Sequence, residues 1–435
     1  MSFHEVKSKK NSWKKNILIS SGCNKSHIIA LAGKLSKNSN HEVNFISSLY
    51  PKRKLKKLLT IFKLNSKAIN RFLDREETLI DENIFSHLIT EILNQFALFL
   101  RRNGFLNLHD KVDGLGCVLY SKFCTKLVKK IRPDIYHYRC CYGLSSADYS
   151  ISNKFISICD HTIAHPRFIY SQIYNDKSFI NPFKERRITD KEAKKMPKML
   201  KLMEADLNKA ENILVNSDFV KKTCVFYGIN ESKIKVIYLG CDDKFLSYEP
   251  KFIKSRNAIN NLLFVGDWSI RKGVIQLSQS LMQIDQEINL TIVGASLNDI
   301  KRITPELLDS KVNLSILGYL SRKELATIYS QHKIFIVPSL CEGSARVAFE
   351  AMASGCYVIA TDFAGTIIKD KENGALVEAF NNYQLKETIL NSFLIPEKIL
   401  SEIMELNFNY VRSNFTHSDY IVKLNNYYEC LYYKF

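Results

Sequence analysis

A chain of 435 residues, 46% of them hydrophobic, can form about two or three domains, each with its own hydrophobic core. No run of about 18 apolar residues is free of charged or strongly polar interruptions, so we expect no membrane-spanning helix. Eleven cysteines without a Cys-x-x-Cys pair argue against a disulfide framework or a metal site, and they favour reduced thiols in a cytoplasmic compartment. The net charge is +18, and the whole excess lies in residues 1–250. This asymmetry predicts a surface for phospholipid headgroups, a lipid-phosphate carrier or nucleic acid, and the alternative is a solvated lysine-rich surface.

The chain begins with a lysine-rich segment that the apolar stretch of a signal peptide does not follow, so we expect no signal peptide. An apolar run at 16–22 ends in a glycine turn, a helical period covers 28–35, and a second apolar run covers 43–47. Strand, helix and strand in this order predict the start of a parallel sheet. Residues 51–130 are mostly helical by pattern and form an insertion. Further strands are predicted at 134–138, 155–159 and 212–216.

Residues 244–258 have a weak pattern and form a candidate linker, after which apolar runs alternate regularly with helical stretches. Two helix starts carry capping boxes, Thr189 with Glu192 and Ser321 with Glu324. The alternation predicts a second doubly wound domain, with its ligand at the carboxyl ends of the strands. The predicted strands of this domain cover 262–265, 290–293, 314–317, 334–337, 357–360 and 375–377.

The segment Pro338–Gly355 has the most distinctive pattern in the chain. A predicted strand ends at Pro338, Gly343 permits a tight turn, and a helix of small and apolar residues follows. We therefore expect the backbone amides of Ser344 and Ala345 to be free donors at a helix N-terminus, where a phosphate binds well.

Two glutamates accompany this turn. Glu342 lies just outside the predicted helix, and Glu350 follows eight residues later, rotated by about 80° around the helix axis. One carboxylate can then meet a sugar ring while the other meets a ribose diol. In the alternative interpretation, Glu342 only complements the helix dipole and Glu350 is solvated.

This arrangement resembles the E-x7-E signature of the retaining family-four glycosyltransferases, and the resemblance extends from about Asn212 to Val377. It implies a GT-B fold, in which two Rossmann-like doubly wound α/β domains face each other across a cleft and a nucleotide sugar is the donor. Other segments that resemble the family are Ser217-Asp218-Phe219, Gly240-Cys241-Asp242 before the second domain, Gly266 with Arg271-Lys272-Gly273 as the donor-diphosphate loop, and Gly318-Tyr319-Leu320 as the loop on the nucleobase.

The sequence departs from the family at one position of the diphosphate loop. The family places an arginine directly after the glycine, where this chain has Asp267. Arg271 and Lys272 can supply two cationic contacts instead, and Asp267 is expected to point away from a diphosphate. Lys272 is the stronger of the two assignments. The alternative places both cations on the solvent face of a helix start.

Two residues of the first domain also match the family's cleft. His161 follows a predicted strand and resembles the family's histidine, which implies a hydrogen bond to the transferred sugar or support of the leaving group. A structural role is the alternative. Gly22 stands where the family has its first glycine-rich loop near the donor phosphate. Because the second glycine of a Walker loop is absent, NTP hydrolysis is excluded.

The resemblance implies catalytic roles for Glu342, His161 and Lys272, with Glu342 as a sugar-binding carboxylate. No D-x-D stands at a strand end, so we expect transfer without a metal and without a cofactor other than the nucleotide-sugar substrate. Helix amides and cations must then stabilise the charge of the leaving group. Retention of configuration is implied by the resemblance alone.

The insertion contains a basic amphipathic segment, Lys52–Lys63, with leucines on one helical face. Such a helix can lie on an anionic membrane, and the alternative is that the leucines pack into the core. Aromatic residues are too few there to favour nucleic acid.

We therefore predict a cytoplasmic or peripheral inner-membrane enzyme that glycosylates a glycan or lipid-linked acceptor in polysaccharide, lipopolysaccharide or glycolipid biosynthesis. Residues 1–250 are expected to bind the acceptor, residues 255–412 to bind the donor, and residues 413–435 to return as a helix to the first domain. The alternatives are a phosphorylase or epimerase on the same fold, and a non-catalytic membrane- or nucleic-acid-binding relative.

Overall fold

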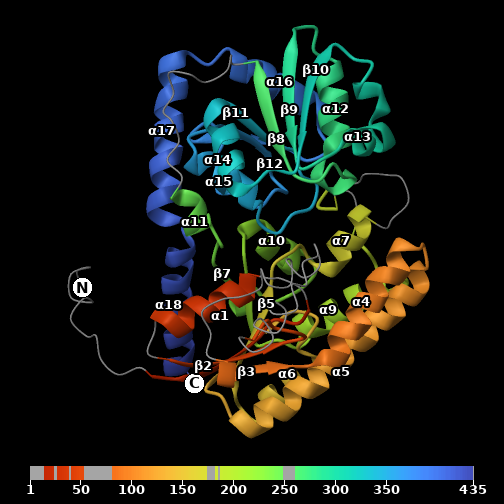
Figure 1. Cartoon of the computed structure of the whole chain (residues 1–435), viewed down its shortest axis with the longest axis vertical. Helices are drawn as coiled ribbons and strands as arrows, with labels where there is room; N and C mark the ends of the chain where they lie inside the picture. The colour runs from red at the N-terminus through yellow and green to blue at the C-terminus, as the bar shows by residue number, and fades with distance from the viewer. Residues whose placement is uncertain are drawn as a thin grey trace, which may run out of the picture. The chain divides into compact units, whose positions relative to one another are not determined.

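The computed structural model describes residues 14–23, 27–38, 41–52, 81–173, 182–184, 187–247 and 260–434. Its first sheet has seven strands in the order β3-β2-β1-β4-β5-β6-β7 (Figure 1). These strands are β1 (Asn16–Ser20), β2 (Glu42–Ser47), β3 (Ile84–Ser86), β4 (Ile135–Arg139), β5 (Ile156–His161), β6 (Asn212–Val215) and β7 (Ile234–Val236). The helices along this part of the chain are α1 (His27–Asn38), α4 (Leu88–Arg102), α5 (Leu106–Ile131), α6 (Leu144–Ser152), α7 (Pro166–Ile173), α8 (Asp190–Ala193), α9 (Lys198–Lys209), α10 (Asp218–Phe226) and α11 (Asp243–Leu246).

The second sheet has six strands in the order β10-β9-β8-β11-β12-β13. They are β8 (Asn261–Val265), β9 (Ile288–Val293), β10 (Val312–Gly318), β11 (Ile334–Val337), β12 (Tyr357–Thr361) and β13 (Gly374–Val377). The helices are α12 (Val274–Met282), α13 (Leu297–Ile303), α14 (Arg322–Gln331), α15 (Arg346–Ala353), α16 (Asn382–Phe393), α17 (Glu397–Asn414) and α18 (His417–Lys434).

Strand pairing in both sheets is parallel wherever its register is described, with Ile17 of β1 opposite Val43 and Ile135, for example. Parallel strands are buried on both faces, which explains why these strands are continuous apolar runs. In each sheet the strand order reverses beside the first strand, between β1 and β4 and between β8 and β11. The predicted fold class, two doubly wound α/β sheets in separate halves of the chain, is confirmed.

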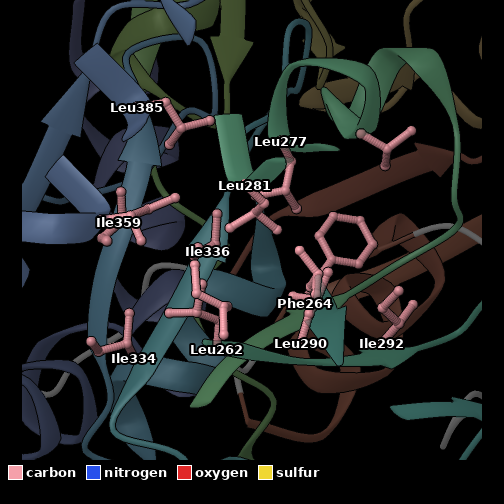
Figure 2. Packing of buried hydrophobic residues seen from close by; sticks show 14 of the residues in the cluster. Leu262, Phe264, Leu277, Leu281, Leu290, Ile292, Ile334, Ile336, Ile359 and Leu385 are labelled. Carbon is pink, nitrogen blue, oxygen red and sulfur yellow. The ribbon is translucent and has the colours of Figure 1, made fainter. Parts of the chain in front are cut away.

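The core of the second sheet shows how the pattern produces the layers. Leu262 and Phe264 of β8 point to one face, where they meet Leu277 and Leu281 of α12 and Leu385 of α16 (Figure 2). The neighbouring strands β9 and β11 add Leu290, Ile292, Ile334 and Ile336 to the same cluster, and each residue named here is at most 3% exposed. Helices that cover a parallel sheet in this way bury it completely, as the sequence pattern predicts.

By their contacts the residues divide into two compact units. Unit 1 comprises Met1–His161, Lys195–Leu214 and Asn425–Phe435, and unit 2 comprises Thr162–Lys194 and Val215–Leu424. In unit 1, the hydroxyl of Tyr428 in α18 lies 2.6 Å from Nδ1 of His137 in β4. The predicted assignment of acceptor and donor binding to separate domains remains a prediction.

Two local predictions can be checked directly. Both capping boxes are present: the Thr189 hydroxyl accepts a bond from the Glu192 amide, and the Ser321 hydroxyl accepts one from the Glu324 amide. The basic segment Lys52–Lys63 lies outside the described residues except for Lys52. Among the helices that are described, none combines the length and the apolar character that crossing a bilayer requires.

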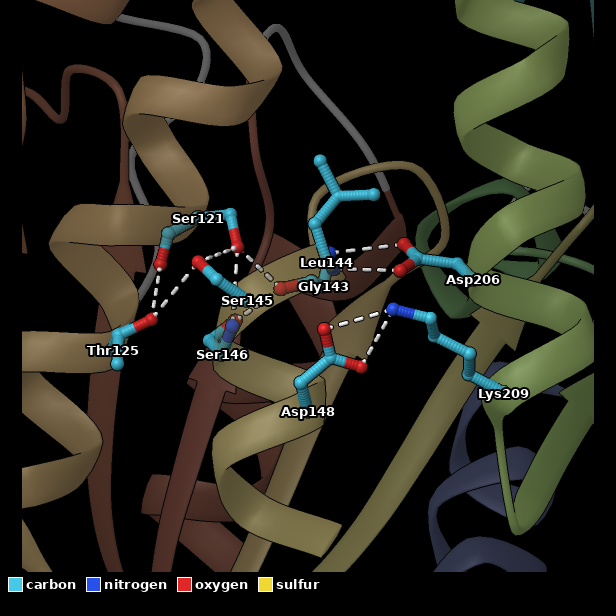
Figure 3. A network of polar contacts seen from close by, with 9 residues as sticks. All are labelled: Ser121, Thr125, Gly143, Leu144, Ser145, Ser146, Asp148, Asp206 and Lys209. Carbon is cyan, nitrogen blue, oxygen red and sulfur yellow. Dashed lines mark hydrogen bonds and ion pairs between the residues drawn. The ribbon is translucent and has the colours of Figure 1, made fainter. Parts of the chain in front are cut away.

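A polar network holds the start of α6 in unit 1 (Figure 3). The Asp206 carboxylate in α9 accepts hydrogen bonds from the amides of Gly143 at 3.0 Å and Leu144 at 2.6 Å. On the other side of the loop, the Ser121 hydroxyl in α5 accepts a bond from the Ser146 amide at 3.2 Å. Burial raises the pKa of Asp206 to about 6, although the two amides act in the opposite direction.

This raised pKa predicts how stability depends on pH. An unfolded aspartate titrates near pH 3.9, so between about pH 4 and 6 the folded state binds more protons at Asp206 than the unfolded state. The stabilisation is full below that unfolded pKa and is lost as pH rises through about 6. From pH 7 to 5 we expect wild type to gain roughly 1–2 kcal/mol over Asp206→Asn in the free energy of unfolding by urea. Asp190→Asn, at an exposed carboxylate outside this network, is the control and should keep the pH dependence of wild type.

Candidate functional site

Two loops meet at the point where the strand order of the second sheet reverses. One loop follows β8 and runs from Gly266 to Gly273, and the other follows β11 and leads through Pro338 into α15. The amide of Leu340 donates to the carbonyl of Arg271 at 2.9 Å, which joins the loops through their backbones. The carboxyl ends of strands at such a reversal are the usual ligand site of an open α/β sheet.

Close backbone approach between the loops requires glycine at position 273. Gly273 has a φ of +71°, and a Cβ there would lie 1.8 Å from the carbonyl oxygen of Pro338. A side chain would therefore meet both backbone strain and a steric clash. This contact keeps Lys272, the preceding residue, beside the loop that follows β11.

The turn at Gly343 is held just as tightly. The Ser217 hydroxyl at the start of α10 donates to the carbonyl of Gly343, and a Cβ at Gly343 would lie 1.7 Å from the carbonyl oxygen of Thr162. The amide of Ala345 donates to the carbonyl of Ala364 at 3.0 Å. The prediction of a free Ala345 amide is therefore wrong: α15 begins only at Arg346, and the preceding amide is used to fix the turn.

We expect Gly343→Ala to destabilise the protein, because an added Cβ would overlap a backbone carbonyl that cannot rotate away. Overpacking of this kind costs about 1–3 kcal/mol, seen as a lower thermal midpoint. Gly116→Ala in α5 is the matched control. Its Cβ would meet Leu93 at 3.7 Å, an ordinary contact, and alanine favours the helix, so the midpoint should stay or rise. Equal midpoints for the two variants would contradict the steric argument.

A cluster of three charged side chains lies between the two loops. Oε1 of Glu342 lies 2.6 Å from Nη1 of Arg271 and also forms an ion pair with Nζ of Lys272. The side chains of Glu342 and Lys272 are only 12% and 13% exposed, so the alternative that both cations face solvent is wrong for Lys272. Burial alone would lower the pKa of Arg271, but Glu342 outweighs it and the pKa is raised. These three side chains together carry one positive charge.

Asp267 stands at the edge of this cluster. Its carboxylate lies 3.8 Å from Nη2 of Arg271, and the side chain is more than half exposed. The pairing is looser than that of Glu342, and solvent screens it.

Glu350 is only partly exposed, so the alternative interpretation, in which it is a freely solvated side chain, is wrong. It lies on α15 with the hydroxyl of Tyr329 3.4 Å from Oε2, and burial raises its pKa. Arg346 and Arg322 act in the opposite direction, and Arg322 also pairs with Asp242. Tyr329 and Arg322 were not predicted from the sequence as neighbours of Glu350. For Arg322, the sequence indicated only that it is the first residue of the helix capped by Ser321.

The loops after the three adjacent strands β8, β9 and β10 are also joined. The amide of Gly266 donates to the carbonyl of Val293, and the amide of Gly294 donates to the carbonyl of Gly318. Gly318 has a φ of +64°, and the ring of Tyr319 that follows it is 88% exposed. An exposed ring beside a glycine turn is free to stack on a flat ligand.

The remaining predicted site residues, Gly22 and His161, lie in unit 1. Gly22 has a φ of +71°, its amide donates to the Tyr120 hydroxyl at 3.1 Å, and the Tyr142 ring lies 2.5 Å from where a Cβ would be. His161 ends β5 and is buried.

A network of hydrogen-bonding side chains that was not predicted from the sequence lies beside His161. Oδ2 of Asp160 lies 2.7 Å from Nε2 of His27 and 3.0 Å from Nε2 of His137. Burial opposes ionisation, yet the two histidines outweigh it and lower the pKa of Asp160. Because the partners come from α1 and β4, no local pattern could have revealed them. In the parts of the chain that are described, no three His, Cys, Asp or Glu side chains come together as a metal site would require.

Comparison with known proteins shows which family part of the chain resembles. Residues 259–393 match the family model of the glycosyl transferases group 1. An uncharacterised glycosyltransferase of Methanocaldococcus jannaschii is 30% identical over 180 residues, which cover 38% of this chain and 46% of that protein. The chain thus spans about half the length of the curated relatives it matches.

Solved structures share the fold over nearly the whole chain. Sucrose-phosphate synthase from Thermosynechococcus elongatus superposes with a TM-score of 0.61 at 15% identity, covering 97% of this chain and all of that one. HepE of Anabaena, solved in complex with UDP and glucose, has a TM-score of 0.58 at 14% identity, with 96% and 100% covered. The family-model match over residues 259–393 agrees with the resemblance to the family-four glycosyltransferases, and the solved structures add the shared fold.

Proposed function

We propose that the chain transfers a sugar from a nucleotide-sugar donor to a glycan or lipid-linked acceptor, with retention of configuration and without a metal. The observation that supports this most directly is the Glu342 carboxylate held by Arg271 and Lys272 at the strand reversal of the group 1 domain. Two cations that share one carboxylate can accept a diphosphate, which carries more negative charge than the carboxylate it displaces.

Each part of the donor has a candidate partner in unit 2. Lys272 and Arg271 bind the diphosphate, helped by the Ser344 amide before the positive end of α15. The Ser344 hydroxyl, buried without a partner among the described residues, supports a ligand at this turn. Glu342, released from the cations, turns to the sugar, and Glu350 accepts hydrogen bonds from the ribose diol.

The base stacks on the loop of Gly318 and Tyr319, and the backbone at Gly266 leaves room for the phosphates. HepE, which shares the fold, was solved with UDP and glucose, which supports a nucleotide-sugar donor here. During transfer, negative charge builds up on the departing diphosphate, and fixed cations in a partly buried site stabilise it without reorganisation.

The acceptor side of the proposal rests on residues 1–250, which include most of unit 1 and part of unit 2. Residues 1–250, which carry the entire excess of positive charge, would bind an anionic glycan or lipid-linked acceptor in polysaccharide, lipopolysaccharide or glycolipid synthesis. His161 would contact the transferred sugar, and the backbone at Gly22 would approach the donor. The eleven free cysteines support a reducing, cytoplasmic setting.

The test is a panel of nucleotide sugars screened first for thermal stabilisation and then for release of nucleoside diphosphate with added acceptors. Release that requires an acceptor, with the anomeric configuration of the product read by NMR, supports a retaining transferase. Turnover that needs inorganic phosphate would identify a phosphorylase, and isomerisation of the donor without release would identify an epimerase. A protein that no nucleotide sugar stabilises would favour a non-catalytic relative.

A further inference from the structure

Helix α4 of unit 1 has its polarity reversed. Its buried positions include Thr90, Glu91 and Asn94, whereas a surface helix normally buries its large apolar residues. Five large apolar side chains of α4 are instead between 47% and 58% exposed. These five residues, which we name the α4 apolar face, are Leu88, Ile89, Ile92, Phe96 and Phe99.

The α4 apolar face is continuous. Leu88, Ile92 and Phe96 are spaced four residues apart and Phe99 follows three later, so they form one stripe along the helix. The rings of Phe96 and Phe99 lie 6.4 Å apart. At the end of the helix the stripe continues into Phe105 and Leu106, which are 59% and 61% exposed. Exposed apolar side chains that gather along one helix face, rather than lying scattered singly, are typical of an interaction site.

The exposed charged side chains at the end of α4 and the start of α5 are basic. Arg101, Arg102 and Lys111, at the corner where α4 meets α5, are exposed. α4 and α5 pack side by side and carry three carboxylates, each engaged in hydrogen bonds. Glu91 is buried and accepts a bond from Gln95, Asp110 accepts bonds from the amides of Lys198 and Met199, and Asp113 accepts one from Asn94.

We propose that the α4 apolar face and its basic corner dock on an anionic lipid bilayer. The apolar side chains would enter the interface while Arg101, Arg102 and Lys111 contact the headgroups, as in amphipathic helices that lie in the membrane plane. A symmetric contact with a second copy is disfavoured, because it would bring the same arginines together without a carboxylate to pair with them. An acidic protein partner would also neutralise these basic residues, but in that case the chain would not bind anionic vesicles in preference to neutral ones.

Flotation of the purified full chain with vesicles tests the proposal. We expect binding to vesicles that contain phosphatidylglycerol, weaker binding to pure phosphatidylcholine, and a decline with added salt. Phe96→Ser combined with Phe99→Ser should lower the partition coefficient about tenfold or more, and so should Arg101→Glu combined with Arg102→Glu. The matched controls are Leu394→Ser, at a residue 77% exposed in unit 2, and Lys301→Glu, at an exposed lysine of α13, and both should bind as wild type does.

Three results would overturn the proposal. One is wild-type protein that does not float with anionic vesicles, and another is a double phenylalanine variant that floats as well as wild type. The third is wild-type protein that sediments as a dimer, a double variant (Phe96→Ser with Phe99→Ser) that sediments as a monomer, and no vesicle binding by either protein. A second copy of the chain would then cover the α4 apolar face. No sugar donor is present in these experiments, so their outcome is independent of the proposed activity.

Discussion

Replacing Lys272 with alanine is expected to lower kcat/KM for the nucleotide-sugar donor roughly 100- to 1,000-fold. The ammonium group is mostly buried beside the Glu342 carboxylate, where its charge is poorly screened by water. In the proposed reaction it faces the diphosphate as negative charge accumulates there. The loss should therefore appear both in turnover and in the affinity for the nucleoside diphosphate alone, measured by calorimetry.

The control for this prediction is Lys301→Ala, at an exposed lysine of α13 in the same unit. It removes the same charge from the domain and should leave both readouts unchanged. Because Arg271 still pairs with Glu342 in Lys272→Ala, the thermal midpoint of that variant should remain close to wild type. If the Lys272→Ala variant stayed active and bound the nucleoside diphosphate tightly, the assignment of Lys272 to the donor site would be wrong.

The sequence predicted the layers of the fold well because buried parallel strands are continuous apolar runs, which stand out without knowledge of their neighbours. It missed β3 and β7, each only three residues long and each at an edge of the first sheet. Strands this short carry too few residues for an alternating or apolar pattern to emerge. β3 also lies directly before α4, inside the stretch 51–130 that the pattern predicts to be mostly helical.

The candidate site was predictable in its parts but not in its contacts. The motifs placed Arg271, Lys272 and Glu342 near one ligand, yet their mutual ion pairs depend on β8 and β11 being neighbours across about 70 residues of chain. The amide of Ala345 was misassigned for the same reason, because its partner Ala364 lies in the loop after β12. Local pattern indicates which chemistry is present, whereas the strand order decides which groups meet.

That ion pairing leads to the second large prediction, for Glu342→Gln. In the unliganded protein the carboxylate occupies the two cations that would bind a diphosphate, so it competes with the donor for them. Removing its charge should tighten binding of the nucleoside diphosphate severalfold, while kcat falls by about 100-fold or more because the sugar loses its carboxylate partner. Calorimetry with the diphosphate and a transfer assay together would show this split between binding and turnover.

Asp267→Asn is the control for this prediction, because it removes a negative charge near Arg271 without removing the carboxylate that is proposed to bind the sugar. Asp267 also places a carboxylate near Arg271, but at 3.8 Å and more than half exposed, where screening weakens it. We expect a smaller gain in diphosphate affinity and no loss of turnover. Glu342→Gln could instead lose diphosphate binding and turnover together. The carboxylate would then serve mainly to hold the two loops in place, because a side chain that only competes for the cations is not needed for the diphosphate to bind. If Glu342→Gln kept full turnover, the sugar-binding role would be wrong, and the ion pair would act only as a placeholder that the donor displaces.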